Sequence, residues 1–301
     1  MLDVSLFLSL AVLWGLSFPA IAVGLEYLPP LLFAAARYDV AAVLLLAYAA
    51  ARFDGWWPSG RNDQAAIVGG GLFLVAGNGL LFIGQQTVPS GVASVLTALV
   101  PIVTAIWAFL LLGERLSSIG LVGIVIGFVG IGLVIQPDPT DFFAGDTIGR
   151  VIIVGQVVSV ALGGVLVQHA NPSIGRVPLT GWSMLLGAIV LHVVSAGAGE
   201  SPNASALAPT AVATILYLGV FSTAIAFFIY FTILEEHGAF EAALVAYLVP
   251  IVATVVGVFV LNESVDALTI GGFVLVAVGF ATLKRHALTD VIDLPIGLGR
   301  P

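Results

Sequence analysis

The sequence is poor in charge and has no cysteine, and each absence excludes a class of protein. Only 9% of the 301 residues are charged, whereas a soluble domain carries about 25%. Because so few charges cannot build a water-facing surface, we expect lipid to cover most of the molecule. Without cysteine the chain can form no disulfide, zinc–thiolate site or thiol nucleophile. The histidines are scattered and predict no metal site: His169, His192, His237 and His286.

Basic residues are scarce as well. The net charge is −8, and Lys284 is the only lysine beside eight arginines. A chain with this acid excess is not expected to bind nucleic acid, whose phosphates attract basic surfaces. Acid excess with little lysine suits a halophilic source, and a GC-rich coding bias is the alternative that the composition leaves open. We expect no metal and no cofactor.

Long apolar runs fill the rest of the sequence. Hydrophobic residues make up 60% of it, and a transmembrane helix needs about 20 predominantly apolar residues. The runs are separated by short connections, which leave no room for a soluble domain. We therefore predict an all-α membrane protein with ten transmembrane helices, at residues 4–23, 30–50, 65–86, 91–112, 119–136, 148–169, 178–198, 209–230, 240–261 and 268–285.

The basic residues of the connections predict the orientation in the membrane, because cytoplasmic connections carry more lysine and arginine. If the N-terminus is cytoplasmic, the outer side carries only Arg150. We expect a multi-pass protein of the cell membrane with both termini in the cytoplasm and a cytoplasmic tail at 287–301. The basic residues then on the cytoplasmic side are Arg52, Arg61, Arg115, Arg176, Lys284, Arg285 and Arg300.

The two halves of the sequence repeat each other. The segment PIVTAIWAFLLLGERLS at 101–117 aligns without a gap with PIVATVVGVFVLNESVD at 250–266, at an offset of 149 residues. Five predicted spans separate the copies, and because five is odd the copies face opposite ways in the membrane. Such inverted repeats place a substrate site near the midplane between the halves in many carriers. The same offset pairs Pro101 with Pro250, Glu114 with Glu263, Gly123 with Gly272 and Gly130 with Gly279.

The repeat also predicts the domain organisation. We expect a first five-helix repeat at 1–137 and a second at 138–286. Pro101 and Pro250 each remove a backbone hydrogen bond and can kink their helices at matching positions. Matched kinks suit a gating motion, and static bends that open a cavity are the alternative. Gly123 and Gly127 form a GxxxG pair that permits close approach of another helix.

Several of these residues stand in the order and spacing of a known family. They are Trp14-Gly15 and Phe18 in the first span, Arg37 in the second, and Pro101 followed by Gly113-Glu114-Arg115-Leu116 in the fourth, with Pro250 and Asn262-Glu263-Ser264 in the second half. Over residues 1 to 286 the chain resembles the EamA-type family of the drug/metabolite transporter superfamily. The resemblance implies ten helices in two five-helix halves around a central substrate cavity. It also implies transport of amino acids, nucleotide-sugar-like metabolites or drugs, often outward. Asn262, in place of a glycine, and Asp39 depart from the pattern.

Polar side chains within the spans mark the candidate site, because such groups are expensive in hydrocarbon and usually face a functional interior. Arg37 lies roughly 10 Å deep at 1.5 Å per residue. Its guanidinium could pair with a carboxylate or phosphate of a substrate. Other polar or amphipathic residues lie at comparable depth on other spans. The predicted substrate-binding residues are Trp14, Arg37, Asn78, Gln156, Tyr217 and Tyr247.

Structural roles are the alternatives for these residues. Arg37 could pair with Asp39 or with backbone carbonyls, although residues two apart do not share a helix face. Asn78 could simply join two helices, and Trp14 could serve packing alone. Glu241, at the cytoplasmic start of the ninth span, is a candidate for a protonatable coupling group if it is buried, and a solvated glutamate at a helix start is the alternative.

These features predict a secondary transporter that moves a small metabolite by alternating access. The family resemblance implies that the metabolite is an amino acid or a similar polar or amphipathic compound and that it is exported. The alternative is a passive pore, which would favour rings of like side chains or filter loops. The sequence has neither. It also lacks HExxH, GxSxG and Walker motifs, so we expect no enzyme. The expected partners are a small-molecule substrate and the lipid bilayer, with the chain a monomer or a homodimer.

Overall fold

The computed structural model describes residues 4–136, 145–202 and 204–283, and only the backbone of residues 145 and 239–241. All secondary structure in these ranges is helical. In chain order the helices are α1 (Val4–Gly15), α2 (Ser17–Leu25), α3 (Pro30–Arg52), α4 (Arg61–Gly69), η1 (Gly70–Val75), η2 (Ala76–Asn78), α5 (Gly79–Gly84), α6 (Ser90–Thr97), α7 (Val100–Leu112), α8 (Ser118–Ile135), α9 (Gly145–Ala170), α10 (Arg176–Gly197), η3 (Ala204–Leu207), α11 (Pro209–Leu216), η4 (Tyr217–Ile225), α12 (Ala226–Glu236), α13 (Ala239–Leu261) and α14 (Ala267–Leu283). η1 and η4 are π-helical, and η2 and η3 are 3₁₀-helical.

The helices join into the predicted membrane spans. Within the described ranges, nine helical segments are long and apolar enough to cross a membrane, and α14 is a shorter apolar helix. The ten-helix prediction is therefore confirmed, with two differences at the ends. The third segment begins at Arg61, because Asp63 accepts backbone hydrogen bonds that start the helix early. The eighth continues to Glu236, and the chain turns only at Gly238, where φ is +98°.

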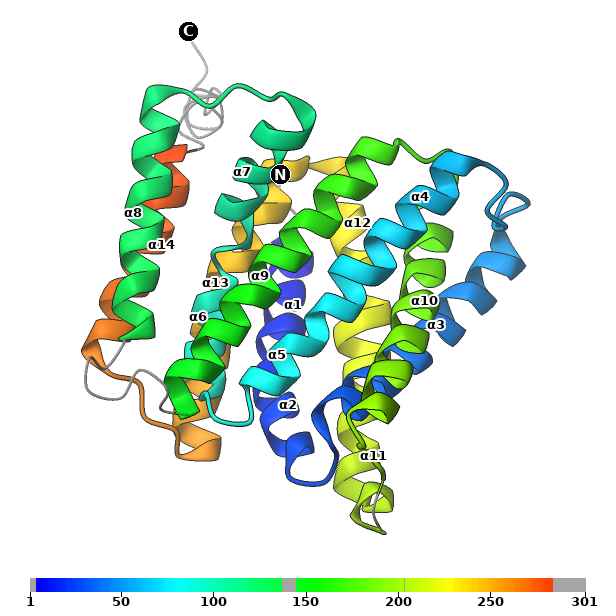
Figure 1. Ribbon diagram of the computed structural model, residues 1–301, viewed down its shortest axis with the longest axis horizontal. Coiled ribbons are helices and arrows are strands. Elements are labelled where there is room, and N and C mark those ends of the chain that lie inside the picture. Colours follow the sequence, from blue (N-terminus) through cyan, green and yellow to red (C-terminus); the bar gives the residue numbers. More distant parts are fainter. Residues whose placement is uncertain (1–3, 137–144, 203, 284–301) are drawn as a thin grey trace, which may run out of the picture.

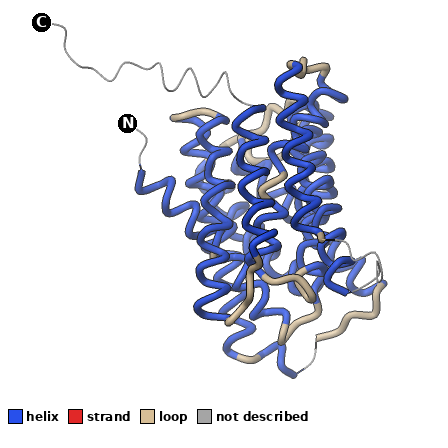
Figure 2. The backbone as a smooth tube through the Cα atoms, turned by 90° about the vertical axis from the view of Figure 1, so that its left-hand side faces the viewer, coloured by secondary structure: helices blue, strands red, loops and turns tan. Residues whose placement is uncertain are grey.

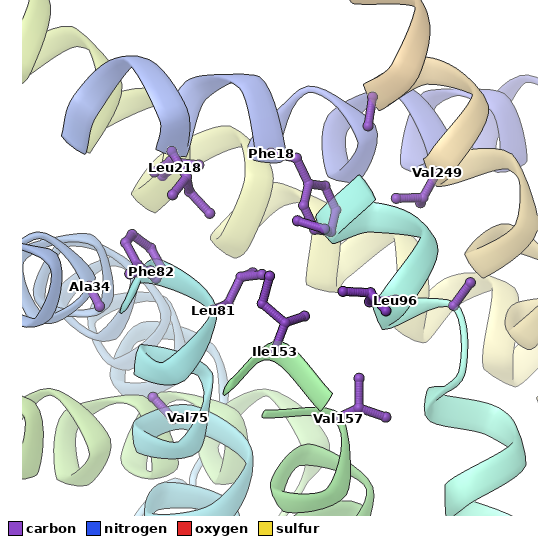
Figure 3. Close-up of a cluster of buried hydrophobic side chains, with 14 of the residues drawn as sticks. Phe18, Ala34, Val75, Leu81, Phe82, Leu96, Ile153, Val157, Leu218 and Val249 are labelled. Carbon is purple, nitrogen blue, oxygen red and sulfur yellow. The ribbon is translucent and has the colours of Figure 1, made fainter. Parts of the chain in front are cut away.

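The long helices run between two faces of the bundle (Figure 2). We call the face at which α1 begins and α14 ends the terminal face and the opposite one the distal face; the terminal face lies uppermost in Figure 1. α8 and α14 stand side by side at one edge of the bundle, and α3 and α10 pack together at the other (Figure 1). A continuous apolar core fills the space between, and in Figure 3 Leu81 of α5 and Ile153 of α9 point toward each other within it.

The contact between α8 and α14 displays the symmetry of the repeat. A methyl group on Gly123 would come within 2.5 Å of the Gly279 carbonyl oxygen, and one on Gly130 within 2.6 Å of the Gly272 carbonyl oxygen. The offset of 149 residues carries Gly123 to Gly272 and Gly130 to Gly279. Exchange of the halves therefore turns each glycine contact into the other. The helices cross in antiparallel fashion, as expected for two inverted five-helix repeats.

The repeat also extends to unusual backbone. Residues 70–75 of η1 correspond to 219–224, which lie within η4, so both halves carry a π-helical segment at the same place. Gly113 and Asn262 end corresponding helices with φ of +69° and +56°. Asparagine is among the few residues other than glycine that adopt this left-handed conformation readily. The exchange of glycine for Asn262 thus preserves the backbone of the turn.

The halves differ at their matched prolines. The fourth span is interrupted at residues 98–99, where the tight bonds Leu99 N–H to Leu96 O and Ile102 N–H to Leu99 O replace α-helical ones. Pro101 consequently lies in the first turn of α7, where a missing N–H costs little. Pro250, in contrast, lies inside the continuous helix α13. Only the first half therefore interrupts its helix at this point, and matching kinks stay a prediction.

Two carboxylates, buried Asp63 and half-buried Glu200, tie helix starts to neighbouring connections at both faces. At the terminal face, Asp63 accepts hydrogen bonds from the backbone N–H groups of Ser173 (2.7 Å) and Ile174 (3.1 Å), just before α10. At the distal face, Glu200 accepts from the N–H groups of Leu31 (3.2 Å) and Leu32 (2.9 Å) at the start of α3. A negative charge at a helix N-terminus stabilises the unpaired N–H groups there. The third span is thus fastened to the connection before the seventh span, and the connection after the seventh span to the start of the second, by comparable bonds.

Candidate functional site

Arg37 is the charged residue at the centre of the candidate site. It lies in α3 with only 7% of its surface exposed. Its Nε donates a hydrogen bond of 2.8 Å to Thr223 Oγ1 of η4, and that hydroxyl donates in turn to the Leu218 carbonyl oxygen at 2.6 Å. The guanidinium carbon also stands 5.1 Å from the centre of the Tyr38 ring. A π-helical segment therefore fixes the orientation of a buried arginine.

Asp39 does not neutralise Arg37. Its carboxylate instead lies 2.7 Å from His192 Nε2 of α10, on a half-exposed part of the bundle surface. Among the residues that the structure describes, no carboxylate oxygen comes within 4.0 Å of the Arg37 guanidinium. The alternative of an Arg37–Asp39 pair is therefore wrong, and the guanidinium keeps donors that Thr223 does not use.

A polar chain runs beside Arg37 across three helices. Gln156 Nε2 of α9 donates to Asn78 Oδ1 at 2.9 Å, and Asn78 Nδ2 donates to the Tyr38 hydroxyl of α3 at 2.7 Å. Gln156 is 4% exposed, and its Oε1 is buried without a hydrogen-bond partner. The structure thus brings together Asn78 and Gln156, which lie 78 residues apart in sequence. The predicted role of Asn78 as a joint between helices and its role in a site are both compatible with this chain.

Trp14 of α1 and Tyr217 of η4 lie where α1, η4 and α12 meet. The Tyr217 hydroxyl donates to the Leu13 carbonyl oxygen of α1 at 3.1 Å. The Trp14 ring packs against Tyr230 and Phe227 of α12, with ring centres 5.5 and 6.1 Å apart. Because η4 carries both Tyr217 and Thr223, it connects the aromatic group on α1 and α12 with Arg37 on α3.

The remaining two predicted residues, Tyr247 and Glu241, both lie on the ninth span. Tyr247 of α13 packs against Phe280 of α14, with ring centres 4.9 Å apart, and its buried hydroxyl has no partner among the described residues. This places Tyr247 toward the α8–α14 edge. Glu241 lies in the first turn of α13, but its side chain is outside the part of the chain that the structure describes.

Sequence reasoning missed Thr223 and Tyr38. Threonine is common in apolar helices, where its hydroxyl usually bonds the preceding turn, so Thr223 carried no signal alone. The sequence does not indicate its π-helical setting, which became visible only when the two halves were compared in the structure. Tyr38 directly follows Arg37, and this adjacency was the available signal.

A surface pocket of 310 Å³ lies apart from these residues, at the distal face. It lies between the starts of α6, α9 and α14, and its polar groups include Asp146, Arg150 and Asp266. Arg150 pairs with Asp146 at 3.4 Å and donates to the carbonyl oxygens of Val134 and Ile135. These bonds secure the end of α8, so we assign this pocket to the packing of the surface.

Comparison with known proteins supports the same fold. One solved crystal structure superposes with a TM-score of 0.66, covering 96% of this chain and 97% of its own, at 17% identity. That likeness concerns the fold alone. Sequence relatives reach further: the Escherichia coli protein YedA, described as an uncharacterized inner membrane transporter, is 30% identical over 92% of this chain and 90% of its own length.

Two more relatives and a family model agree with this. The Bacillus subtilis protein YvbV, described as an uncharacterized transporter, is 25% identical over 92% of this chain and 90% of its own length. A WAT1-related chloroplastic protein of Arabidopsis thaliana is 27% identical over 86% of this chain and 64% of its own. The model of the EamA-like transporter family matches residues 1–136 and 147–284. The chain therefore belongs to the EamA-like transporter family and is a multi-pass membrane transporter.

Proposed function

We propose that this transporter carries a small metabolite with an anionic group, an amino acid or a similar polar or amphipathic compound, by alternating access through a central cavity. The observation that carries the proposal is Arg37, a buried guanidinium with one anchoring bond and no carboxylate partner among the described residues. A charge buried without a partner costs several kcal/mol, on the order of the penalty for a single desolvated ion. A substrate anion would remove that cost.

The geometry of the guanidinium suits such a substrate. Its five N–H donors form a planar fork, and Thr223 occupies only the one at Nε. The outer edge of the fork matches a carboxylate or phosphate, which it binds through two parallel hydrogen bonds. The lining predicted from the sequence supplies the rest of the site in this proposal: Trp14, Asn78, Gln156, Tyr217 and Tyr247, with Glu241 as the coupling residue. Export stays a prediction from the family resemblance.

A ligand screen followed by a flux assay tests this function. Purified protein is heated with amino acids, sugar phosphates and nucleosides, since a ligand of the folded state raises the melting temperature. We expect anionic compounds to raise it and their amide or ester analogues to leave it unchanged. Uptake of the best compound, added in labelled form outside proteoliposomes, is then measured. We expect this uptake to saturate with concentration, and to become faster when the proteoliposomes are loaded with the unlabelled compound. Stabilisation by neutral analogues alone would contradict the anionic substrate, and linear, non-saturating flux would favour the passive pore.

The orientation and the domain limits belong to the same proposal. We propose that the terminal face is cytoplasmic, with repeats at 1–137 and 138–286 and a cytoplasmic tail at 287–301. Described basic residues of that face include Arg52, Arg61, Arg115 and Arg176, whereas Arg150 lies at the distal face. A reporter enzyme fused after Pro301 should be active only in its cytoplasmic form. A reporter fused at the connection 198–202 should give the opposite reading, and activity of the tail fusion outside the cell would reverse the orientation.

A further inference from the structure

Glu263 joins the fourth and ninth spans at the distal face. It follows α13, and its Oε1 accepts a hydrogen bond of 2.9 Å from the Ser90 N–H at the start of α6. Its Oε2 accepts from Ser90 Oγ at 2.7 Å and from the Gly91 N–H at 3.4 Å. One carboxylate thus caps the first turn of α6 from another helix, 173 residues away in sequence.

Two glycines make room for this contact. A methyl group on Gly257 of α13 would come within 2.8 Å of Ser90 Oγ and would also meet the Glu263 carboxylate. A methyl group on Gly91 of α6 would lie 2.9 Å from Thr254 Oγ1. The two helices therefore approach closely at the distal face, and the carboxylate closes the junction.

The repeat places an equivalent carboxylate at the terminal face. Glu114 follows α7 as Glu263 follows α13, after the same left-handed turn. Each backbone N–H bonds the carbonyl at the corresponding position, Ala108 for Glu114 and Gly257 for Glu263. The offset that relates the halves carries Ser90 and Gly91 to Ala239 and Phe240, the first two residues of α13. The N-terminus of α13 is thus the counterpart of the one that Glu263 caps.

The two carboxylates nevertheless differ in their surroundings. Glu114 is exposed and makes no side-chain hydrogen bond within the part of the chain whose contacts the structure describes. The packing differs in the same sense. Seven of the eight residues of α6 are buried, whereas α7, its continuation toward the terminal face, buries only Ile102, Val103 and Ala108. α6 packs against both α13 and α2. The fourth span is therefore enclosed on nearly all sides at the distal face, whereas α7 packs mainly against α9 and leaves much of its remaining surface exposed.

We propose that Glu263 and Glu114 are alternating latches of two gates, and that the structure is the state in which the distal gate is closed. This proposal rests on the alternating access proposed above. In the other state Glu263 releases the start of α6. The Glu114 carboxylate then accepts hydrogen bonds from the backbone N–H groups at the start of α13. In this structure the fourth span is broken before Pro101, whereas the corresponding helix α13 is continuous. In the other state we expect the reverse, with a continuous fourth span and a broken α13.

Two other carboxylates, which accept hydrogen bonds from backbone N–H groups far away in sequence, set the contrast. Asp63 and Glu200 each hold their helix start in this structure, one at each face. Because both are engaged at once, they fasten helices that keep their contacts in either state. Glu263 is therefore the latch of the closed gate, and Glu200, at the same face, is its matched control.

Spin-label distances test the latches, and the natural absence of cysteine allows labels at chosen sites. One pair, Gln86→Cys with Leu268→Cys, spans the distal gate; another, Arg115→Cys with Glu236→Cys, spans the terminal gate, and all four residues are exposed. The protein is measured in lipid nanodiscs without added ligand. We expect Glu263→Gln to lengthen the distal distance and shorten the terminal one in part of the molecules. The ratio of the two populations should change about fivefold, as typically follows the loss of one capping contact.

The controls keep the result interpretable. Glu200→Gln should leave both distance distributions as in the unsubstituted chain, and Glu114→Gln should leave the distal gate closed. If Glu263→Gln does not fold, Ser90→Ala removes one donor of the latch and should shift the populations in the same direction by less. Unchanged distances in folded Glu263→Gln would overturn the latch proposal. If that variant does not fold, unchanged distances in Ser90→Ala would overturn it. Saturable flux in the wild-type chain would then still support the transporter proposal, whereas linear flux would contradict that proposal whatever the distances.

Discussion

Arg37→Ala is expected to lower transport per folded molecule about 100-fold, because a hydrogen-bonded ion pair with the substrate contributes roughly 3 kcal/mol. Arg37→Lys should lose about tenfold, since an ammonium is a point charge and cannot reproduce the planar fork. The measurement is initial uptake in proteoliposomes, normalised to the folded protein recovered by size-exclusion chromatography. It uses the anionic compound that gives the largest thermal shift.

Arg176→Ala is the matched control for this substitution. Arg176 is also an arginine that bonds another helix, but its pair with Glu235 at 3.0 Å is exposed at the terminal face. Exposed pairs contribute little, so transport by Arg176→Ala should equal that of the wild type. A purely structural Arg37 would give another pattern: both substitutions would reduce folded yield, while transport per folded molecule stayed constant. That pattern would remove Arg37 from the substrate site.

Gly123→Leu should destabilise the bundle by about 3 kcal/mol, the upper range for overpacking. The ideal Cβ position is 2.5 Å from the Gly279 carbonyl oxygen and 2.7 Å from the Leu283 N, and backbone atoms cannot move aside as a flexible side chain can. α8 and α14 would have to separate. A lowered melting temperature in detergent and a reduced folded yield are the measurements that check this.

Gly132→Leu provides the comparison on the same helix. No atom lies within 4 Å of a Cβ at Gly132 among those that the structure places around it, so the same substitution meets open space there. Its melting temperature should stay close to that of the wild type. Equal loss of stability in the two variants would show that α8 and α14 do not meet at Gly123.

The sequence predicted the spans well because a bilayer imposes its thickness on every helix. Each crossing needs a long apolar run, and the polar turns between runs leave little choice of boundary. The predicted boundaries were wrong where a helix continues beyond its apolar run, as it does before residue 65, where Asp63 caps the helix start, and after residue 230, up to Glu236. The inverted arrangement was predictable from the residues that recur at a fixed offset, with Glu114 and Glu263 the most specific of them.

Which helices lie side by side, and which polar side chains bond to each other, was not predictable from the same signals. In lipid, the inward and outward faces of a helix are both apolar: Ile124 is buried while Val125, the next residue of α8, is 61% exposed. Hydropathy therefore cannot tell which face packs on which neighbour. The bond from Arg37 to Thr223 joins residues 186 apart, and the pairing of Asp39 with His192 joins residues 153 apart. Only the three-dimensional arrangement selects such partners.

The glycine crossing between α8 and α14 fits an origin by gene duplication. A surface that maps onto itself under exchange of the halves is one that a single ancestral half could offer to a second copy of itself. Because such a half would cross the membrane five times, fusion of two copies end to end would insert them in opposite orientations without further instruction. The antiparallel contact would then exist from the moment of fusion. A half with an even number of crossings would have placed its copies parallel, and the same glycines could not have met.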